Sequence, residues 1–442
     1  MFKNAFTFLE ERGFIEQLSD EKLRDLFAEQ QVTCYVGFDP SGISLHVGHL
    51  LPMMALAHVQ RCGHISIGLL GGGTGMIGDP SGKSEERVLL SEEALERNAD
   101  GVKAQLERLL KPENSNTENV KIINNADWLG KYSLIEFLRD IGKHFRVSEM
   151  LAKESVKRRM EIGEGISFTE FSYMLLQSAD FLHLLRDHNC IIQFGGTDQW
   201  GNITAGIDLI RKIEGKQAYG ATFPLITTAS GQKLGKTEKG AIFLDPNLTS
   251  PYEFFQYWIN TDDKDVIKYL KWFTSLSLSE IDELAKLTET EPEARKSQRV
   301  LAYEVTKFIH GVEQADIAVK TSEILFGQEI VNVTDEMLEE IFKDVPSTSI
   351  FIPPAGVIPR LVPSGIIPPA GVIMPIVDVM VKCGISKSRS EVRRLIANGG
   401  VYLNNKRVVD PDFIVTRESL ASAHIAVLRT GKKNYHLLRF SE

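Results

Sequence analysis

The feature that most constrains the fold is an alternation of short β-rich runs with helical stretches between Val32 and about Leu248. The expected elements are strands at Val32–Phe38, Ile65–Leu70, Val120–Ile123 and Ile191–Phe194, and a helix at Val47–Cys62. This alternation predicts an α/β fold with a parallel sheet. Ligands of such sheets lie at the carboxyl ends of the strands, so that edge is where a site is expected.

The length of the chain predicts several domains, because 442 residues are too many for one hydrophobic core. From Pro251 to about Val345 the residues Glu, Lys, Leu and Phe recur at helical spacing, which indicates an all-α domain. We therefore expect domains at 1–248, 249–345 and 376–442, joined by a segment at 346–375.

The segment 346–375 is rich in proline and contains an internal repeat. Ile-Pro-Pro-Ala-Gly-Val-Ile occurs at 352–358 and again at 367–373. Prolines at this density forbid a continuous helix and interrupt a central strand. The pattern predicts a linker that is extended or irregular. We have no physical account of the duplication.

Charge is distributed unevenly between the last part of the chain and the rest. The whole chain carries a net charge of -9, but residues 376–442 hold 12 Lys and Arg against 6 Asp and Glu. A small basic module on an acidic body indicates that this module meets a polyanion. A short basic domain that is merely solvated is the alternative, which charge alone does not exclude.

The cysteines and the amino terminus point to a cytoplasmic protein. The four cysteines lie far apart with no CxxC pair, which argues against a disulfide framework or a structural zinc site. The first residues, with Glu10 and Glu11 and no apolar core, are not those of a secretory signal. No apolar stretch is long enough to span a bilayer, so no membrane association is expected.

Two histidines follow the first expected strand. Tyr35–Pro40 ends that strand in a tight turn, and Ser44–Leu50 carries His46 and His49 at the start of the next helix. A helix amino terminus offers free N–H groups and a positive dipole end, which suit a phosphate. Histidines alone at this spacing are more often a solvated or core-satisfied pair than a phosphate site.

A second candidate is the segment Gly231–Thr237, with the sequence GQKLGKT. Its two lysines and its hydroxyl lie on a glycine-containing loop, and such a loop can neutralise charge that develops on a polyphosphate. The spacing is not that of a Walker A loop. A lysine-rich loop taken alone is usually an exposed charged loop.

A third candidate is a polar stripe on an otherwise apolar helix. Tyr173, Gln177 and Asp180 are spaced i, i+4 and i+7, so they share one face. A partly buried carboxylate and amide need partners, which a polar ligand could supply. A solvated polar face is about as good an interpretation on spacing alone.

Two glycine-rich turns complete the set. Gln193–Asn202 runs from a strand through glycines into a helix, and Gly71–Gly75 is similar and is followed by Asp79. Such turns allow a nucleotide to approach the backbone closely, with acceptors for ribose hydroxyls nearby. Each is weak evidence alone, because tight strand-to-helix turns need glycine in any case.

The combination of these motifs resembles a class I aminoacyl-tRNA synthetase. His46–His49 (HVGH) resembles the HIGH signature of that class, and Lys233–Thr237 (KLGKT) resembles its KMSKS signature. The longer strings YVGFDPSGISLHVGHL, GDPSGK, SFTEFSYMLLQSADFL and GGTDQWGNITAG resemble bacterial-type tyrosyl-tRNA synthetases. The resemblance covers nearly the whole chain. Departures are modest: Val36 stands where relatives carry Cys, and Leu234-Gly235 replaces Met-Ser.

The resemblance implies a role for each matching residue. Catalytic contacts to the phosphates fall to His46, His49, Lys233, Lys236 and Thr237. The substrate tyrosine is implied to contact Tyr35 and Asp180 through its phenol, Asp79, Tyr173 and Gln177 through its ammonium group, and Gln193. The residues implied to bind ATP or the adenylate are Gly37, Asp39, Gly48, Gly195, Asp198, Gln199, Lys83 and Arg87.

The basic module resembles the S-four RNA-binding domain, named for a ribosomal small-subunit protein. Ser388 and Glu391 have the spacing of a capping box, and a Gly-Gly pair and a strand follow the helix. The helix carries the implied RNA-binding residues Lys387, Arg389, Arg393 and Arg394. Phosphate contacts from such a helix would make RNA affinity sensitive to salt.

The fold class that the resemblance implies is α/β: a Rossmann-like catalytic domain, an all-α anticodon-binding domain and a small α+β RNA-binding domain. The implied partners are L-tyrosine, ATP with Mg²⁺, tRNA(Tyr) and a second copy of the chain. No metal site built by the protein alone is expected. The rival hypotheses are a tryptophanyl-tRNA synthetase, a small adenylyltransferase, and an RNA-binding protein on an inactive synthetase scaffold.

Overall fold

The computed structural model describes residues 4–81, 89–110, 119–162, 165–229, 231, 234–237, 240–343, 345–351, 372–431 and 434–441. The chain forms two compact units, Met1–Ala315 and Asp316–Glu442. Lys83, Arg87, Lys233 and most of the proline-rich segment lie outside the described residues. None of the described helices is long and apolar enough to cross a membrane.

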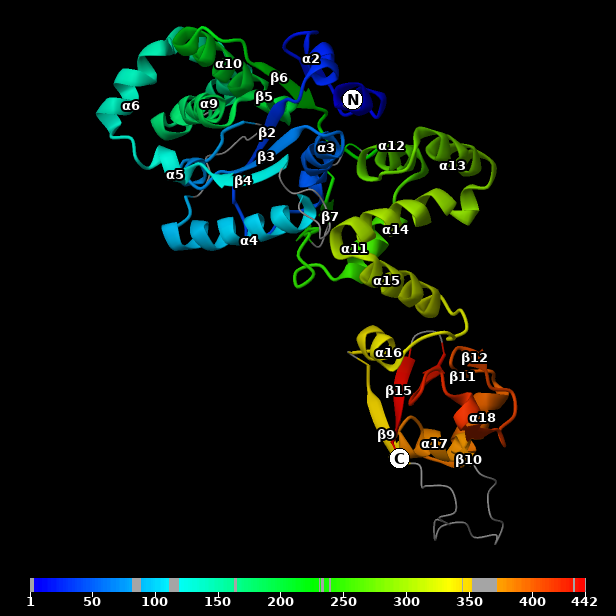
Figure 1. Cartoon of the computed structure of the whole chain (residues 1–442). Coiled ribbons are helices and arrows are strands. Elements are labelled where there is room, and N and C mark those ends of the chain that lie inside the picture. The colour runs from blue at the N-terminus through cyan, green and yellow to red at the C-terminus, as the bar shows by residue number, and fades with distance from the viewer. Residues whose placement is uncertain are drawn as a thin grey trace. The chain divides into compact units, whose positions relative to one another are not determined.

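The first unit is built on a six-stranded sheet with the order β1-β6-β5-β2-β3-β4, shown in blue to green in Figure 1. All neighbouring strands are parallel except β1, which pairs antiparallel with β6. The strands are β1 (Gln17–Leu18), β2 (Thr33–Phe38), β3 (Ile65–Leu70), β4 (Val120–Asn124), β5 (Cys190–Gly196) and β6 (Tyr219–Phe223). The expected parallel α/β sheet is confirmed.

The strand order has a switch point at β2. From β2 the chain moves outward through β3 and β4 on one side, and β5 and β6 fill the other side. Connections that diverge in this way leave a crevice beyond the carboxyl ends of the central strands. The crevice therefore lies beyond Phe38 of β2 and Gly196 of β5, where the motif residues are concentrated.

Helices cover both faces of this sheet, as Figure 1 shows. Alternate residues of a strand point to opposite faces, and the contacts follow this rule. Ile67 lies in the core cluster with Phe181 and Leu209, whereas Ser66 donates to the Leu56 carbonyl oxygen at 2.8 Å. The helices before the all-α part are α1 (Ala5–Glu11), α2 (Leu23–Glu29), α3 (Leu50–Arg61), α4 (Glu92–Leu110), α5 (Ala126–Leu129), α6 (Leu134–Asp140), α7 (Val147–Leu151), α8 (Glu154–Ile162), α9 (Phe168–His188) and α10 (Trp200–Glu214).

The all-α part of the first unit follows the sheet. Its helices are α11 (Pro251–Ile259), α12 (Asp263–Phe273), α13 (Leu278–Thr290), α14 (Lys296–His310) and α15 (Val312–Leu325), which continues into the second unit. Capping boxes at Ser250/Glu253 and Ser277/Glu280 begin α11 and α13. Trp258 is fully buried among Tyr269 and Phe273, so aromatic packing fixes α11 against α12.

Arg12 and Trp272 join the amino-terminal helix to this all-α part. The Arg12 guanidinium is buried and donates to the carbonyl oxygens of Lys271 and Thr274, each at 3.0 Å. Trp272 Nε1 donates to the Gly13 carbonyl oxygen at 3.0 Å. Arg12 thereby satisfies carbonyl groups at the carboxyl end of α12, which a helix leaves without partners.

His58 on α3 gives the first testable prediction, which concerns stability against pH. Its ring is buried against Phe8 and Phe14, and burial, with a smaller contribution from Arg61 and Arg12, lowers its pKa to about 3. The unfolded chain therefore binds a proton that the folded chain does not between pH 6.5 and 3, and stability falls as the pH falls through that window. From pH 7 to pH 5 this one group costs about 2 kcal/mol of the free energy of unfolding.

We expect the His58→Leu variant to lose about 2 kcal/mol less stability than the parent chain over the same pH change. Urea denaturation of both proteins at pH 7 and pH 5 measures the difference. Equal losses in the two proteins would show that His58 does not titrate in the way its burial requires.

The second unit contains a five-stranded sheet with the order β12-β11-β14-β15-β9 and a separate pair, β10-β13. Its elements are α16 (Asp335–Ile341), β9 (Ser347–Phe351), β10 (Val372–Pro375), α17 (Ile376–Lys382), α18 (Arg389–Ala397), β11 (Val401–Leu403), β12 (Lys406–Arg407), β13 (Ile414–Thr416), β14 (Ile425–Thr430) and β15 (Asn434–Ser441). The described parts form an α+β arrangement, as expected.

The segment 346–375, expected to be extended or irregular, is described by the structure only at its two ends. Both of these ends are strands: β9 pairs parallel with β15, and β10 pairs with β13. Proline density did not prevent this, because Ser347–Phe351 contains no proline. The expected boundary at 345 also divides a core in which Ile324 and Leu338 cluster with Val427 and Leu437. The domain boundaries stay predictions.

Candidate active site

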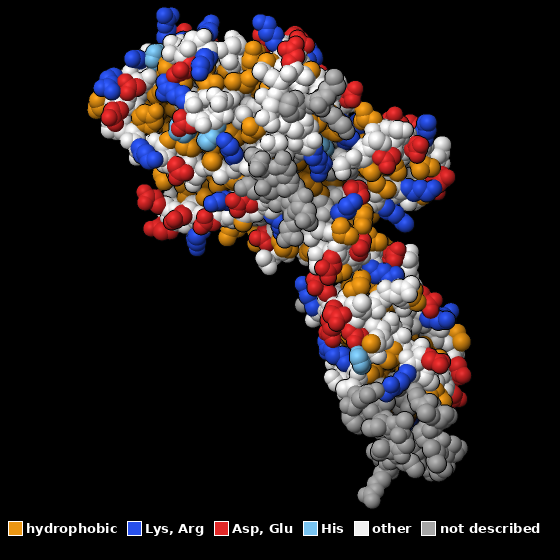
Figure 2. All heavy atoms as spheres, viewed as in Figure 1, with side chains coloured by type: hydrophobic (Ala, Val, Ile, Leu, Met, Phe, Trp, Pro, Cys, Tyr) orange, Lys and Arg blue, Asp and Glu red, His pale blue; other side chains and the backbone are white. Residues whose placement is uncertain are grey.

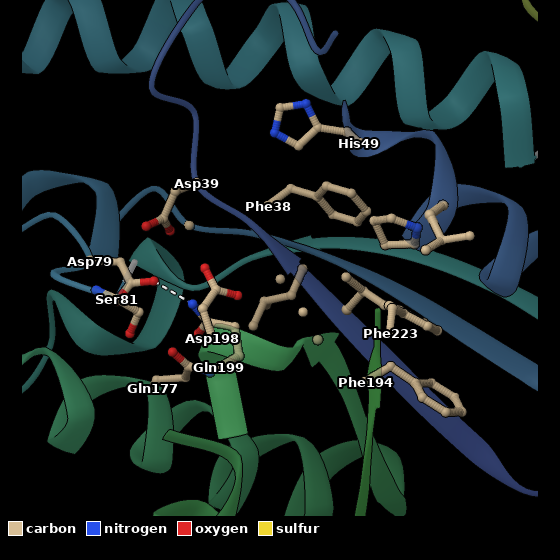
Figure 3. Close-up of a pocket in the computed structure, with 18 of the residues that line it drawn as sticks. Phe38, Asp39, His49, Asp79, Ser81, Gln177, Phe194, Asp198, Gln199 and Phe223 are labelled. Atoms are coloured by element: carbon tan, nitrogen blue, oxygen red, sulfur yellow. Dashed lines mark hydrogen bonds between the residues drawn. The ribbon is translucent and has the colours of Figure 1, made fainter. Parts of the chain in front are cut away.

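A cavity of about 420 Å³ lies beyond the carboxyl ends of β2 and β5. Figure 3 shows Asp39, Asp79, Asp198 and Gln199 around this hollow, with the hydrogen bond between Gln199 and Asp79 dashed. The cavity brings together most of the residues singled out in the sequence. They are Tyr35, Gly37, Asp39, His46, Gly48, His49, Asp79, Tyr173, Gln177, Asp180, Gln193, Gly195, Asp198 and Gln199.

The inner part of the cavity contains a buried carboxylate that is held on both oxygens. Asp180, 1 % exposed, accepts from Asn125 Nδ2 and from Trp128 Nε1, each at 2.8 Å. Burial raises the pKa of Asp180 to about 8, against the effect of these two hydrogen bonds. The two donors fix the orientation of the carboxyl group at the wall of the cavity.

Two other buried polar atoms line the same cavity without a partner in the part of the chain that the structure describes. They are the Tyr35 hydroxyl oxygen and Gln193 Oε1. Tyr35 is 1 % exposed, and burial, followed by the charge of Asp180, raises the pKa of its phenol well above the ordinary value. Tyr35 therefore stays neutral. Buried polar groups are almost always hydrogen-bonded, so these two atoms mark a place for a polar ligand.

Asp39 joins three segments at the mouth of β2. It accepts from the Tyr173 hydroxyl and from Thr74 Oγ1, each at 2.8 Å. Asn125 also donates to Thr74 Oγ1 at 3.0 Å, so this group and the Asp180 group form one network. A Cβ at Gly71 would collide with the Asp39 carboxylate, which explains the glycine there.

A second polar network lines the side of the cavity formed by α9 and α10. Asp79 accepts from Gln199 Nε2 at 2.5 Å, and Asn202 Nδ2 donates to Gln199 Oε1 at 3.1 Å and to Gln177 Oε1 at 3.0 Å. Asp79 also accepts from the backbone N–H of Ser81 at 2.9 Å. Tyr173, Gln177 and Asp180 line one cavity from one face of α9, so the interpretation of the polar stripe as a ligand-facing surface is favoured over a solvated face.

The two histidines lie at a 3-10 turn, η1 (Val47–His49), which leads into α3. The expected helix at Val47–Cys62 is therefore regular only from Leu50. His46 Nδ1 accepts from the Gly48 backbone N–H at 3.0 Å, and His49 Nδ1 accepts from the His46 backbone N–H at 3.2 Å.

These backbone bonds fix the tautomer of both rings. A neutral imidazole that accepts at Nδ1 carries its proton on Nε2, so each ring presents Nε2–H as a donor. Burial, and next the neighbouring His46, lower the pKa of His49 to about 3, which keeps its ring neutral. The turn therefore offers hydrogen-bond donors without added charge.

The lysine segment lies against this histidine turn. Leu234 lines the cavity, and a Cβ at Gly235, whose φ is +81°, would collide with the Val47 side chain. The expected loop is partly a strand, because β7 (Lys236–Thr237) pairs with β8 (Gly240–Ala241). Lys233 lies outside the described residues.

At the outer edge of the cavity the backbone is open. A Cβ at Gly37 would meet no atom within 4 Å, whereas one at Gly195 would lie 3.0 Å from Gln199 Cβ. Asp198 is exposed on η5 (Thr197–Gln199), at the end of β5. A flat group can therefore approach the β2 backbone, with the Asp198 carboxylate nearby as an acceptor.

The basic residues of α18 lie on the surface of the second unit. Ser388 caps this helix by accepting from the Glu391 backbone N–H at 3.3 Å. Arg389 pairs with Asp378 at 2.5 Å and Arg393 pairs with Asp412 at 2.8 Å, while both side chains stay more than half exposed. Lys387 and Arg394 are also exposed.

Sequence reasoning missed the residues that hold the predicted ones in place. Asn125 and Trp128 fix Asp180, Thr74 bonds Asp39, and Asn202 bonds both Gln177 and Gln199. Asn125 and Trp128 follow the carboxyl end of an expected strand, which is the signal that could have identified them.

Comparison with known proteins decides the family. A model of the class I tRNA synthetases of the W and Y type matches residues 28–327, and a model of the tyrosine--tRNA ligase SYY-like C-terminal domain matches residues 337–438. The tyrosine--tRNA ligase of Geobacillus stearothermophilus is 48% identical over 98% of this chain and 99% of its own. The chain belongs to the tyrosyl-tRNA synthetase family.

Other relatives agree with this membership. The tyrosine--tRNA ligase of Roseiflexus castenholzii is 48% identical over 97% of each chain. A C-terminally truncated mitochondrial tyrosyl-tRNA synthetase from Aspergillus nidulans has a TM-score of 0.67 at 34% identity, covering 73% of this chain and 94% of its own. A tryptophanyl-tRNA synthetase from Encephalitozoon cuniculi, at 16% identity and a TM-score of 0.53, shares the fold alone. These synthetase relatives exclude the small adenylyltransferase as the family of this chain.

Proposed function

We infer that the chain is a tyrosine–tRNA ligase, an ATP-dependent enzyme that activates L-tyrosine and transfers it to the 3′ end of tRNA(Tyr). The observation that carries the substrate assignment is the inner cavity. Tyr35 Oη and Gln193 Oε1 are buried there without a partner among the described residues, next to Asp180. The hydroxyl of a phenol that enters this space can both donate and accept a hydrogen bond. An indole can only donate one, and a phenyl ring can do neither.

The substrate tyrosine is held at both ends. Tyr35 and Asp180 take its phenol, and Asp79, Tyr173 and Gln177 take its ammonium group. Asp79 and the Asp39–Tyr173 pair line the same cavity and provide the carboxylates that an ammonium group needs. Gln193 also lines the cavity and is the remaining residue of the proposed tyrosine pocket.

ATP occupies the outer edge of the cavity. Gly37 and Gly195 allow its nucleoside to approach the strand ends, and Asp39, Asp198 and Gln199 serve as acceptors for ribose hydroxyls. Gly48 leaves room for the His46 ring to pack against the turn, since a Cβ at this position would lie 2.7 Å from His46 Cε1. The phosphates are contacted by His46, His49, Lys233, Lys236 and Thr237, with Lys83 and Arg87 toward the pyrophosphate.

Magnesium enters this account only with the substrate. The described residues contain no cluster of three metal-binding side chains. Mg²⁺ is commonly held by substrate phosphates and a few protein oxygens rather than by a complete protein cage. We propose that it arrives bound to the ATP phosphates.

The reaction proceeds in two steps. A carboxylate oxygen of tyrosine attacks the α-phosphorus of ATP in line, the bond to the bridging oxygen breaks, and tyrosyl-adenylate and pyrophosphate result. A terminal ribose hydroxyl of the tRNA then attacks the tyrosyl carbonyl carbon and displaces AMP. No protein nucleophile takes part, so positioning of the reactants and stabilisation of charge on the phosphates supply the catalysis.

The carboxyl-terminal module contributes to tRNA binding through α18. Arg389, Arg393 and Arg394 are exposed on this short helix and Lys387 is exposed just before its N-cap, as a phosphate-contacting surface requires. The helices α11–α14 serve as the anticodon-binding domain. The enzyme acts in the cytoplasm, where its tRNA and ATP are available.

The chain works as a homodimer. An apolar surface supports this proposal: Leu134 and Ile135 on α6 are 70% and 72% exposed, and Phe168 at the start of α9 is 76% exposed. Hydrophobic side chains reach the surface over α6 in Figure 2. Exposed apolar side chains gathered in one region mark interaction sites.

We expect the Phe168→Glu variant to be monomeric under conditions in which the parent chain is dimeric. A two-fold interface carries the change twice, so the loss is roughly 3 to 6 kcal/mol. Sedimentation equilibrium measures the mass, which should fall to that of one chain, 49.4 kDa. The control is Phe326→Glu, an equally exposed phenylalanine of the second unit. A dimeric Phe168→Glu variant would remove this surface from the interface.

The function is tested by the complete reaction. The parent chain, incubated with ATP, radioactive tyrosine and tRNA(Tyr), should form acid-precipitable tyrosyl-tRNA. The Arg393→Glu/Arg394→Glu variant should form tyrosyl-adenylate normally but require more tRNA, with the difference growing at low salt. If the parent chain makes tyrosyl-adenylate but charges no tRNA, the transfer step is assigned wrongly.

A further inference from the structure

The segment between β6 and α11 is tied to the active site by its backbone. Leu234 N–H donates to the Ile226 carbonyl oxygen at 3.1 Å, and Ile242 N–H donates to the Gly235 carbonyl oxygen at 3.0 Å. Ile242 in turn accepts from Val47 N–H of the histidine turn at 3.0 Å. The backbone of the lysine segment is therefore linked by hydrogen bonds, through Ile242, to the histidine turn, whose residues contact the phosphates in the proposed function.

The same segment is held from its other side by two side chains of the all-α part. Gly235 N–H donates to the Tyr257 hydroxyl oxygen of α11 at 3.0 Å, and Ala229 N–H donates to Asp265 Oδ2 of α12 at 2.6 Å. Lys268 Nζ strengthens the second contact, because it donates to Asp265 Oδ1 at 2.9 Å and to the Thr227 carbonyl oxygen at 3.3 Å.

Tyr257 and Asp265 are themselves fixed in position. The Tyr257 ring packs edge-on against Trp258, which is fully buried, with ring centroids 5.2 Å apart. Asp265 is 4% exposed and lies in the first turn of α12. The two contacts thus hold the backbone of Ala229 and Gly235 against the all-α core. These two residues lie on either side of Lys233 in the sequence.

We propose that Tyr257 and Asp265 are positioning residues of the adenylation step, which hold Ala229 and Gly235, and with Gly235 the neighbouring Lys236, in register with the histidine turn. The inference rests on the proposed role of Lys236. Neither side chain is among the described residues that line the cavity. Each acts through the backbone that it holds. Displacement of a catalytic group by about 1 Å costs on the order of 100-fold in rate, which sets the scale of the effect.

The first test removes one oxygen atom from Tyr257. The Tyr257→Phe variant keeps the ring against Trp258 and loses the acceptor for Gly235 N–H. We expect its single-turnover rate of tyrosyl-adenylate formation, at saturating tyrosine and ATP, to fall roughly 10- to 100-fold. The dissociation constant for tyrosine, measured by equilibrium dialysis, should stay within about twofold, since the tyrosine pocket is untouched. Tyr252→Phe, on the same helix, is the matched control and should react at the parent rate.

A double-mutant cycle separates positioning from a general structural role. If Tyr257 acts through Lys236, which follows Gly235, Tyr257→Phe should slow adenylation strongly in the parent chain. The same substitution made in the Lys236→Ala variant should slow adenylation much less. For Asp265 the pair is Asp265→Ala, expected to be slow, and Asp265→Asn, which keeps an acceptor for Ala229 N–H and should recover most of the rate.

The outcomes are distinct. A parent chain that forms no tyrosyl-adenylate overturns the proposed function and the inference with it. An active parent chain with a Tyr257→Phe variant of equal rate overturns the inference alone. A rate loss that multiplies fully with that of Lys236→Ala, or that is accompanied by weakened tyrosine binding, would assign Tyr257 a structural role and also reject the inference.

Discussion

The Asp180→Ala variant is expected to lose nearly all tyrosine activation. The substitution removes the acceptor proposed for the substrate phenol and leaves Asn125 Nδ2 and Trp128 Nε1 facing a site from which their acceptor is gone. Two buried donors without an acceptor and the lost bond to the substrate phenol together cost roughly 3 to 6 kcal/mol, or about 10²- to 10⁴-fold in kcat/KM.

The measurement is kcat/KM for tyrosine in pyrophosphate exchange. Asp187→Ala is the control, because Asp187 lies on the same helix with its side chain 56% exposed. Its activity should equal that of the parent chain. Normal activation by Asp180→Ala would remove Asp180 from the site. In the Asp180→Ala variant, selection of tyrosine over phenylalanine should also weaken. A site that binds a substrate hydroxyl rejects the analogue that lacks it, and tyrosyl-tRNA synthetases are the standard example of this rule.

The His46→Ala variant should slow adenylate formation by roughly 3 to 4 kcal/mol, about 10²- to 10³-fold. His46 Nδ1 is engaged by Gly48 N–H, so the ring presents Nε2–H, and the variant removes this donor from the phosphate end of the cavity. The contribution is made in the transition state, where charge on the phosphates develops. Lys236→Ala and Lys233→Ala should act in the same way.

Single-turnover rates together with tyrosine affinity distinguish a loss of transition-state stabilisation in the His46→Ala variant from damage to its tyrosine pocket. The rate should fall while the dissociation constant for tyrosine stays nearly constant. His424→Ala, at an exposed histidine of the second unit, is the control. Weakened tyrosine binding in His46→Ala would count against the assignment of this residue to the phosphates.

Much of the catalytic fold could be predicted because its strands are short, apolar and bounded by turns. The strand Ile65–Leu70 was predicted with its observed bounds, and β2 and β5 differ from the expected ranges by a few residues at most. The residues that follow β2 and β5 were placed at one site because parallel strands end at the same edge of a sheet. The polar stripe on α9 followed from helical spacing.

The rest depends on contacts between distant segments, which a local pattern does not contain. Asn125 and Trp128 take their importance from Asp180, more than fifty residues away, and their place after an expected strand does not by itself show that contact. The strand β9 was missed for a similar reason, because its pairing with β15 near the carboxyl terminus stabilises it. The ties of Tyr257 and Asp265 to the lysine segment are of the same kind.

Tyrosine-dependent exchange between ATP and pyrophosphate, with phenylalanine and tryptophan in parallel, tests the central claim most directly. The buried Tyr35 and Asp180 predict exchange with tyrosine and none above background with the other two amino acids. Exchange with tryptophan would mean that the inner cavity is assigned to the wrong substrate. A folded chain that supports no exchange with any amino acid would contradict the catalytic account and favour an RNA-binding protein on a synthetase scaffold.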